Sequence, residues 1–197
     1  MPTRNRKAVS YAGTISHSGV TYRINSSATR GVYPQLVHTA IDQLEVCLSK
    51  WGRVFAMRFD LHQKVQTGDS KMLTMFRKNL KRRLERKYRM VDMGYLWARE
   101  QQTAKQQHYH FALFLDGDLI RHATALSKII MDTWESIRAG NSVHIPKRCF
   151  YTVADADSKA KVIYRISYLA KVRGKGCLLY TSPSPRDLST SRMPSSA

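Results

Sequence analysis

The sequence predicts an α+β domain built around an antiparallel β-sheet. Residues 54–62 and 108–116 alternate between apolar residues and other residues, as strands do. Residues 35–50, 73–90 and 119–140 instead place apolar residues at helical spacing. A chain of 197 residues with 43% hydrophobic content is long enough for one domain with a substantial core and short tails.

The N-terminal third combines a polar segment, a helix and a strand. Residues 1–34 are basic and rich in Ser, Thr and Gly, which predicts a weakly ordered arm with one short hairpin around Ser18 and Gly19. A helix is expected over residues 35–50. The strand over residues 54–62 should direct Phe55, Met57, Phe59 and Leu61 into a core, and the alternate set of side chains to its other side.

The remaining elements complete a recognisable order. A basic helix over residues 73–90 precedes a strand over 95–102, a polar turn and the strand over 108–116. A helix over 119–140 should end at Gly140, and a strand near 147–156 precedes a last helix over 158–173. Split β-α-β units of this kind predict a ferredoxin-like or RRM-like antiparallel sheet, with helices packed on one face, across residues 35–176.

The composition changes at Cys177. The segment "CLLYTSPSPRDLSTSRMPSSA" (residues 177–197) is rich in Ser, Pro and Thr without periodicity, so we expect it to be disordered. It also resembles the translated sequencing-adapter read-through found at the ends of genes assembled from environmental DNA. We therefore expect it to be non-native, and the natural chain to continue differently after about Gly176.

The charge of the chain indicates a polyanionic partner. Lys and Arg number 33 against 14 Asp and Glu, a formal net charge of +19, which favours nucleic acid. The sequence has no membrane-length apolar run, no signal-peptide core and no P-loop motif. Three scattered cysteines argue against a disulfide framework and favour a reducing cytoplasm. A non-enzymatic basic protein would have the same charge.

The strand "HYHFALFLDGD" begins with two potential metal ligands. Alternation places His108 and His110 on the same face of the sheet. Glu100 lies on the preceding strand, where antiparallel pairing could bring it beside them. Two imidazoles and one carboxylate leave open positions on Mg²⁺ or Mn²⁺ for phosphate oxygens and water, which makes these three residues candidate ligands. Alternatively, Glu100 is a solvated residue at the end of its strand.

The last helix carries candidate nucleophiles. Tyr164, Tyr168 and Lys171 fall within roughly 60° of one another on a helical wheel, away from the aliphatic face. A phenol near a lysine and a metal-bound phosphate can act as a covalent nucleophile, because both cations favour the phenolate and stabilise developing phosphoryl charge. In the alternative, these are surface tyrosines that contact DNA or another element.

These residues carry a resemblance to a known family. The segments "RFDLH", "HYHFALFLDGD" and "YRISYLAK" resemble the three motifs of HUH endonucleases, and the chain is most similar to the inovirus-type gene-two replication proteins and their prophage relatives. The resemblance covers about residues 33–173 and implies the HUH endonuclease fold. By position, it implies that His108 and His110 are the two metal histidines, that Glu100 is the acidic third ligand, and that Tyr168 and Lys171 form the tyrosine-lysine motif.

Further residues match less closely. Tyr164 forms a Tyr-x-x-x-Tyr pair with Tyr168, as in initiators with two nucleophiles, which leaves open which tyrosine attacks first. Asp60 and His62 take supporting roles. The residues expected to contact DNA are Arg58, Lys81, Arg82, Arg86, Lys161 and Arg165.

The expected activity is metal-dependent nicking and rejoining of one DNA strand at a replication origin. The resemblance implies a tyrosine joined to the 5′ phosphate and a free 3′-OH that primes rolling-circle replication of a filamentous phage or prophage. The expected partners are single-stranded origin DNA and a host helicase, in the cytoplasm of a bacterial host and without a membrane. Two alternatives stay open: a non-catalytic nucleic-acid-binding module, and a relaxase or transposase that uses the same chemistry.

Overall fold

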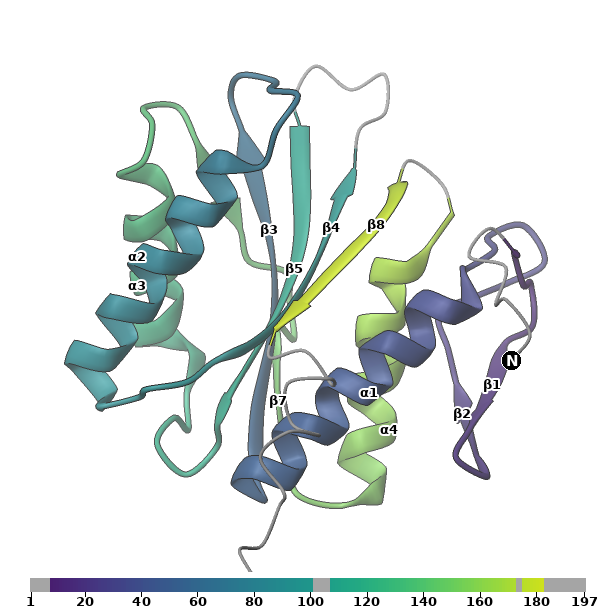
Figure 1. Ribbon diagram of the computed structural model, residues 1–197. Coiled ribbons are helices and arrows are strands. Elements are labelled where there is room, and N and C mark those ends of the chain that lie inside the picture. Colours follow the sequence, from purple (N-terminus) through teal and green to yellow (C-terminus); the bar gives the residue numbers. More distant parts are fainter. Residues whose placement is uncertain (1–7, 101–106, 173–174, 183–197) are drawn as a thin grey trace, which may run out of the picture.

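A computed structural model describes residues 8–100, 107–172 and 175–182 (Figure 1). The polar turn expected after residue 100 lies largely outside the described residues. The elements, in chain order, are β1 (Thr14–His17), β2 (Val20–Arg23), α1 (Pro34–Trp51), β3 (Val54–Gln63), α2 (Lys71–Tyr88), β4 (Gly94–Glu100), β5 (Gln107–Asp116), α3 (Ala123–Glu135), β6 (Ser142–His144), β7 (Phe150–Val153), α4 (Ala156–Ile166), the 3₁₀ helix η1 (Ser167–Ala170) and β8 (Lys175–Ser182).

Antiparallel pairing joins six strands into the main sheet. Along the sheet the order is β6-β3-β5-β4-β8, and β7 pairs with the first half of β3 while β6 pairs with its second half. All of these pairs are antiparallel. The predicted α+β class with an antiparallel sheet is therefore confirmed, and β1 and β2 form a separate two-stranded sheet.

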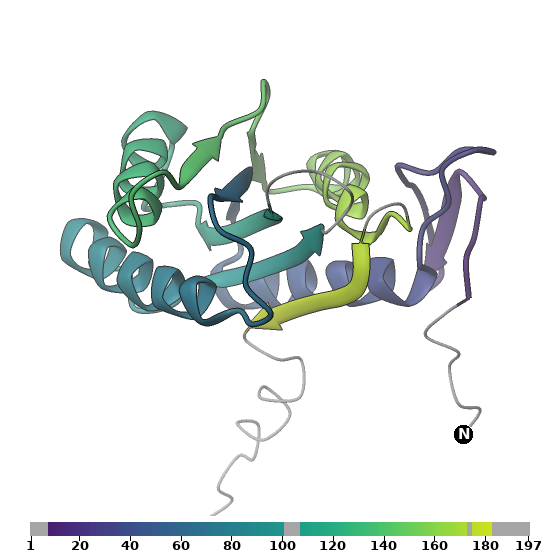
Figure 2. The ribbon, with the colours of Figure 1, turned by 90° about the horizontal axis from the view of Figure 1, so that it is seen from above.

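Helices cover both faces of the sheet. Phe59 and Phe111, whose rings stack at 4.9 Å, belong to a core that also buries Phe76 of α2 and Trp134 of α3. A second core on the opposite face packs Ala112 and its neighbours against α1 and α4. Figures 1 and 2 show α2 and α3 on one side of the sheet and α1 and α4 on the other. The prediction that helices pack on one face is therefore wrong.

The second core has a physical reason in the sequence. The alternate positions of β3, β4 and β5 carry small or apolar residues, which are Val54, Ala56, Leu96, Ala98, Ala112 and Phe114. Small side chains allow a helix to approach a sheet closely, and all six are buried. Sequence alternation predicted the Phe-rich core, but it interpreted the other face by its two candidate metal histidines and not as a second core.

The N-terminal segment is better ordered than expected. The hairpin predicted around Ser18 and Gly19 is present as β1 and β2. Residues 1–7 lie outside the described part, but Tyr22, Ile24 and Val32 are buried in the second core. A basic, Ser-rich composition concealed these three anchors, because composition averages over the segment. The expectation of a weakly ordered arm is wrong for residues 8–34.

The C-terminal elements also differ from the expectation. Residues 175–182 form β8, which pairs with β4, so the disorder predicted from residue 177 does not hold for 177–182. The rest of the predicted tail, 183–197, lies outside the described residues. Helix α4 begins at a capping box in which Asp155 accepts from the Ser158 N–H at 2.8 Å, and the α-helix ends at Ile166, earlier than residue 173. Likewise α3 ends at Glu135, before Gly140.

Within the described residues, no helix has both the length and the apolar character needed to cross a bilayer.

Close packing between α1 and β4 gives a first prediction. A Cβ added at Gly94 would overlap the Sγ of Cys47 and approach the Cβ of Phe114 to 3.3 Å. Gly94→Ala should therefore lower the free energy of unfolding by about 1–3 kcal/mol, measured by urea denaturation. Gly68→Ala, where nothing lies within 4 Å of the added Cβ, is the control.

A double variant separates steric overlap from other effects. Combining Gly94→Ala with Cys47→Ala vacates the space that the new methyl group needs, so the pair should cost less than the sum of the two single changes. Strict additivity, or a Gly94→Ala protein as stable as Gly68→Ala, would contradict the described packing.

Candidate functional site

Three adjacent strands bring two carboxylates to one histidine. Asp60 of β3 pairs opposite His110 of β5, and Glu100 of β4 pairs opposite the neighbouring His108. The Nδ1 of His110 lies 2.7 Å from Oδ1 of Asp60, and its Nε2 is in contact with Oε2 of Glu100. Both ring nitrogens of His110 therefore face carboxylate oxygens.

Asp60 is a member of this cluster that is ionised at neutral pH. It is buried, and its Oδ1 and Oδ2 lie 3.0 and 3.2 Å from Nη2 of Arg58, which is also buried. Burial alone would raise the pKa of Asp60. The hydrogen bond from His110 and the charge of Arg58 outweigh burial and bring the pKa down to about 2. Ionised Asp60 can thus accept a hydrogen bond from the Nδ1–H of His110 and fix the orientation of its ring.

Two further histidines border the cluster. The rings of His62 and His108 are 4.2 Å apart between centroids, across the β3–β5 pair. His144 of β6 places its Nδ1 3.3 Å from Oδ2 of Asp60. Burial, followed by the proximity of His108, lowers the pKa of His62 and favours the neutral imidazole. His144 was missed from the sequence because β6 is three residues long and carries no strand pattern.

Tyr168 lies against this cluster from η1. Its ring meets the ring of His110 edge-on, with centroids 5.1 Å apart and planes at 88°. The guanidinium of Arg58 lies 4.4 Å from the Tyr168 ring centroid, and Nζ of Lys171 lies 5.0 Å from it. Burial raises the pKa of the Tyr168 phenol, and the nearby Glu100 adds to this, whereas Arg58 acts in the opposite direction.

The N-terminal segment holds η1 in place. The N–H of Tyr33 donates to the Ala170 carbonyl at 2.9 Å, and the N–H of Asn25 donates to the Ser167 hydroxyl at 2.8 Å. Val32 also forms a β-bridge with Lys171. The segment predicted to be a weakly ordered arm therefore positions the part of the chain that carries Tyr168.

Tyr164 is directed elsewhere. It is exposed on α4, where the guanidinium of Arg23 lies 5.8 Å from its ring. The helical wheel that grouped Tyr164, Tyr168 and Lys171 assumed a continuous α-helix. The α-helix ends at Ile166, the next four residues form η1, and Lys171 is extended. Of the two tyrosines, Tyr168 is the one in contact with the histidine cluster.

The three predicted metal ligands are neighbours but are not fully assembled. Glu100 and His110 are in contact, whereas the ring of His108 packs against His62. Among the described residues, a different trio, on β1 and α1, has ligand atoms that all lie within 4.8 Å of one another. The residues nevertheless suit a metal. In metal-binding histidines the nitrogen that does not bind the metal usually has a partner such as a carboxylate, and Asp60 is that partner for Nδ1 of His110.

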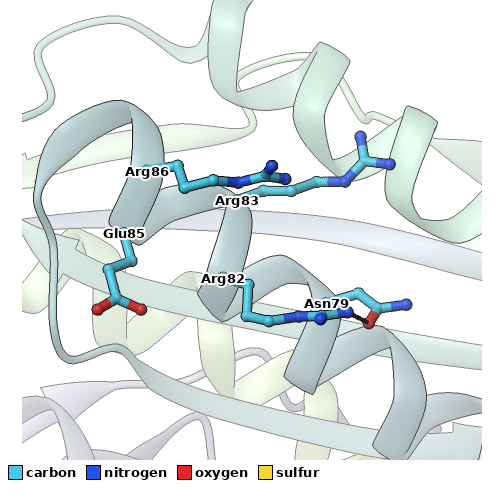
Figure 3. A pocket seen from close by; sticks show the side chains of 5 residues that line it. All are labelled: Asn79, Arg82, Arg83, Glu85 and Arg86. Atoms are coloured by element: carbon cyan, nitrogen blue, oxygen red, sulfur yellow. Dashed lines mark hydrogen bonds between the residues drawn. The ribbon is translucent and has the colours of Figure 1, made fainter.

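The predicted DNA contacts divide between two faces. Arg58 belongs to the histidine cluster itself. Lys81, Arg82 and Arg86 lie on α2, which packs on the opposite face of the sheet. Figure 3 shows Arg82, Arg83 and Arg86 around an open pocket on α2, where Arg82 donates to Asn79 at 2.7 Å. These arginines therefore form a basic surface separate from the cluster.

The remaining two predicted contacts lie on α4. Lys161 is exposed and pairs with Asp157 one helical turn earlier. Arg165 is partly buried and donates to the Lys147 carbonyl at 3.3 Å. Both are on the helix that leads into η1, on the same side of the sheet as Tyr168.

The fold and the cluster define an α+β domain that presents histidines, carboxylates and a tyrosine together on one face of an antiparallel sheet. The family model of the YagK/YfjJ C-terminal domain matches residues 20–178. Because this match spans most of the chain, the chain belongs to the YagK/YfjJ C-terminal domain family. No curated protein and no solved structure matched it.

The buried Arg58–Asp60 pair gives a second prediction. Asp60→Ala should lower the free energy of unfolding by about 3–5 kcal/mol, because it removes the buried carboxylate that pairs with the buried guanidinium of Arg58. The measurement is urea denaturation at neutral pH. Asp118→Ala removes an exposed partner of Arg53 and should change stability by less than about 1 kcal/mol.

A rescue variant tests the reason. Arg58→Met with Asp60→Ala removes both charges and should be more stable than Asp60→Ala alone. If Asp60→Ala and Asp118→Ala were equally stable, the buried pair would not exist as described.

Proposed function

We propose that this domain nicks and rejoins single-stranded DNA at a replication origin, with Tyr168 as the nucleophile. The observation that carries the proposal is the contact of Tyr168 with His110, whose two nitrogens face Asp60 and Glu100. A phenol beside a candidate metal ligand, with two cationic side chains at its ring, is the arrangement that phosphoryl transfer to tyrosine requires.

The proposed reaction exchanges one phosphodiester for another. The Tyr168 oxygen bonds to phosphorus, the bond from phosphorus to the 3′ oxygen breaks, and the phenol proton leaves to a nearby base while the 3′ oxygen gains a proton. The products are a 5′-phosphotyrosine and a free 3′-OH. Attack of a 3′-OH on the phosphotyrosine reverses every step, so strands can be rejoined without ATP.

The chain's own charges stabilise this transfer only in part. Arg58 and Lys171 lie at the Tyr168 ring, where they would face the charge that develops on the phosphate. Burial and Glu100 hold the phenol protonated, so Arg58 and Lys171 do not by themselves generate a phenolate. A divalent cation would supply the missing positive charge at the phosphate and favour ionisation of the phenol.

The donor set indicates which cation suits the site. His110 through Nε2, Glu100 through a carboxylate oxygen and His108 after rotation away from His62 would provide two nitrogens and one oxygen. Imidazole suits transition metals better than Mg²⁺, whereas the carboxylate suits both. Of the two expected cofactors, Mg²⁺ and Mn²⁺, we therefore favour Mn²⁺. Asp60 would orient His110 and need not bind the metal itself.

The arrangement of the elements supports the proposal that the domain has the HUH endonuclease fold. The order β3-α2-β4-β5-α3-β7, with strands arranged β7-β3-β5-β4 in space, follows the split β-α-β pattern of a ferredoxin-like sheet. Sequence motifs on β3, β5 and the α4–η1 segment resemble those of HUH endonucleases. We propose the HUH fold on these grounds, with α1 and α4 covering the second face.

The biological setting follows from the same resemblance. Rolling-circle replication of a filamentous phage or prophage, in the cytoplasm of a bacterial host and with a host helicase, remains our proposal for this domain. A relaxase or transposase would use the same chemistry. A non-catalytic nucleic-acid-binding module is the alternative of a different class, and the separate basic surface on α2 favours it.

The nucleophile gives a third prediction. Tyr168→Phe should reduce Mn²⁺-dependent nicking of single-stranded DNA by at least about 10³-fold, because it removes the attacking oxygen and keeps the ring. The measurement is the rate of single-strand nicking on a labelled pool of DNA sequences. Tyr164→Phe is the matched control and should leave the first nick unchanged, since Tyr164 points away from the cluster.

The outcomes separate a nicking enzyme from a non-catalytic nucleic-acid-binding module. Equal nicking by wild type and Tyr168→Phe would rule out Tyr168 as the nucleophile. Absence of Mn²⁺-dependent nicking in the wild type, with DNA binding intact, would favour the non-catalytic module.

The α2 surface gives a fourth prediction. Replacing Lys81, Arg82 and Arg86 together with Ala should weaken DNA binding and flatten the slope of log affinity against log salt by about 2 units, about 0.7 per lost phosphate contact. Nicking at saturating DNA should be retained, because α2 lies on the face opposite Tyr168. Removing three exposed charges elsewhere, at Arg121, Lys128 and Arg138, is the control.

Either of two results would contradict the assignment of DNA binding to α2 and of catalysis to the opposite face. An unchanged salt slope would remove α2 from the DNA contacts. Loss of nicking at saturating DNA would place α2 in the catalytic step.

A further inference from the structure

A second cluster of metal-ligating side chains lies far from Tyr168 in the sequence, where the N-terminal hairpin meets α1. His17 ends β1, and Asp42 and Glu45 lie three residues apart on α1. One ligand atom from each of these residues lies within 4.8 Å of the other two. Figure 1 shows the hairpin beside α1, and the histidine side chain is 10% exposed.

The two distances from His17 to the carboxylates match a metal shell better than a pair of charge-assisted hydrogen bonds. Nε2 of His17 lies 3.2 Å from Oδ1 of Asp42 and 3.6 Å from Oε2 of Glu45. A charge-assisted hydrogen bond would be about 2.7–2.9 Å long. Tetrahedral bonds of about 2.0–2.1 Å to a shared Zn²⁺ would instead place neighbouring ligand atoms about 3.3 Å apart.

The second shell is also in place. Nδ1 of His17 lies 2.9 Å from Nδ1 of His38, so His17 can donate its proton there and keep the lone pair of Nε2 free for a metal. The other oxygen of Glu45, Oε1, accepts from Nζ of Lys159 at 2.7 Å. That contact holds the carboxylate with Oε2 toward His17. Each ligand thus comes from a regular element, and His17 and Glu45 each have a second partner that orients them.

We propose that His17, Asp42 and Glu45 bind a Zn²⁺-type divalent cation that fastens the β1–β2 hairpin to α1. Three protein ligands with one nitrogen and two oxygens leave a fourth tetrahedral position for water. The cation would offset the charge of the two carboxylates, which share one face of α1. None of its residues belongs to the His110 cluster, so metal binding here can be tested separately from the proposed nicking activity.

The position of the site gives it a structural role. The chain from β2 continues directly into residues 25–33, which bond to η1 and its flanking residues. A cation that anchors the hairpin would therefore stabilise residues 25–33, which hold η1 and its Tyr168 in place. The site acts through the fold, and its residues take no part in chemistry.

Metal titration of the full-length protein tests the proposal. Metal-free wild type, Asp42→Asn and the control Asp118→Asn would be titrated with Zn²⁺ by calorimetry and with Co²⁺ by visible absorption, which is intense only for tetrahedral cobalt. Wild type and Asp118→Asn should show a tetrahedral Co²⁺ signal, and Zn²⁺ should raise their melting temperatures by several degrees. Asp42→Asn should lose the tetrahedral signal. His38→Phe should weaken Zn²⁺ binding by about 10–100-fold.

A variant of the other cluster separates this proposal from the proposed function. His110→Ala should keep the tetrahedral Co²⁺ signal and the Zn²⁺ stabilisation, whether or not the protein nicks DNA. If Asp42→Asn does not fold, Glu45→Gln replaces it. The amide oxygen of the glutamine can still accept from Lys159, and its NH₂ group, which cannot bind a metal, then faces His17. Unchanged binding by these ligand variants, loss of the signal in His110→Ala, or the absence of tetrahedral binding by the wild type would each overturn the proposal.

Discussion

The pairing of β5 with β3 on one side and β4 on the other is the constraint on which the candidate site depends. This register places His110 between Asp60 and Glu100, residues separated from it by 50 and 10 positions in the chain. A slip of one residue in either pair would send the facing carboxylate to the opposite face of the sheet. The Phe-rich core on that opposite face fixes the register, because the same slip would expose it.

Coverage of both sheet faces then determines the electrostatics. Helices α1 and α4 close over the face that carries the cluster, so Arg58 and Asp60 are buried, and a buried charge must find a partner. Arg58 meets that need for Asp60 and also reaches the ring of Tyr168. The N-terminal segment secures η1 by hydrogen bonds from its backbone N–H groups, which makes the position of Tyr168 depend on residues 25–33.

Local patterns predicted the parts of this site that a single element determines. Alternation within one strand was enough to place His108 and His110 on the same face of the sheet. The tyrosines and the lysine of the α4–η1 segment indicated that this segment belongs to the candidate site. Contacts between distant segments could not be predicted. The Asp60–His110 bond requires the register of two strands, and the separation of Tyr164 from Tyr168 depends on where α4 ends. Composition concealed the anchors Tyr22, Ile24 and Val32, and the position of α2 opposite the cluster needed the tertiary fold.

The most direct test of the central claim is to locate the covalently bound nucleotide after reaction with single-stranded DNA and Mn²⁺. Trypsin cleaves after Arg165, so the two tyrosines fall in different peptides, residues 162–165 and 166–171. After nuclease digestion, mass spectrometry should find the added nucleotide on peptide 166–171, attached to Tyr168. A nucleotide on peptide 162–165 alone, or on neither peptide under conditions in which the DNA is nicked, would contradict the account.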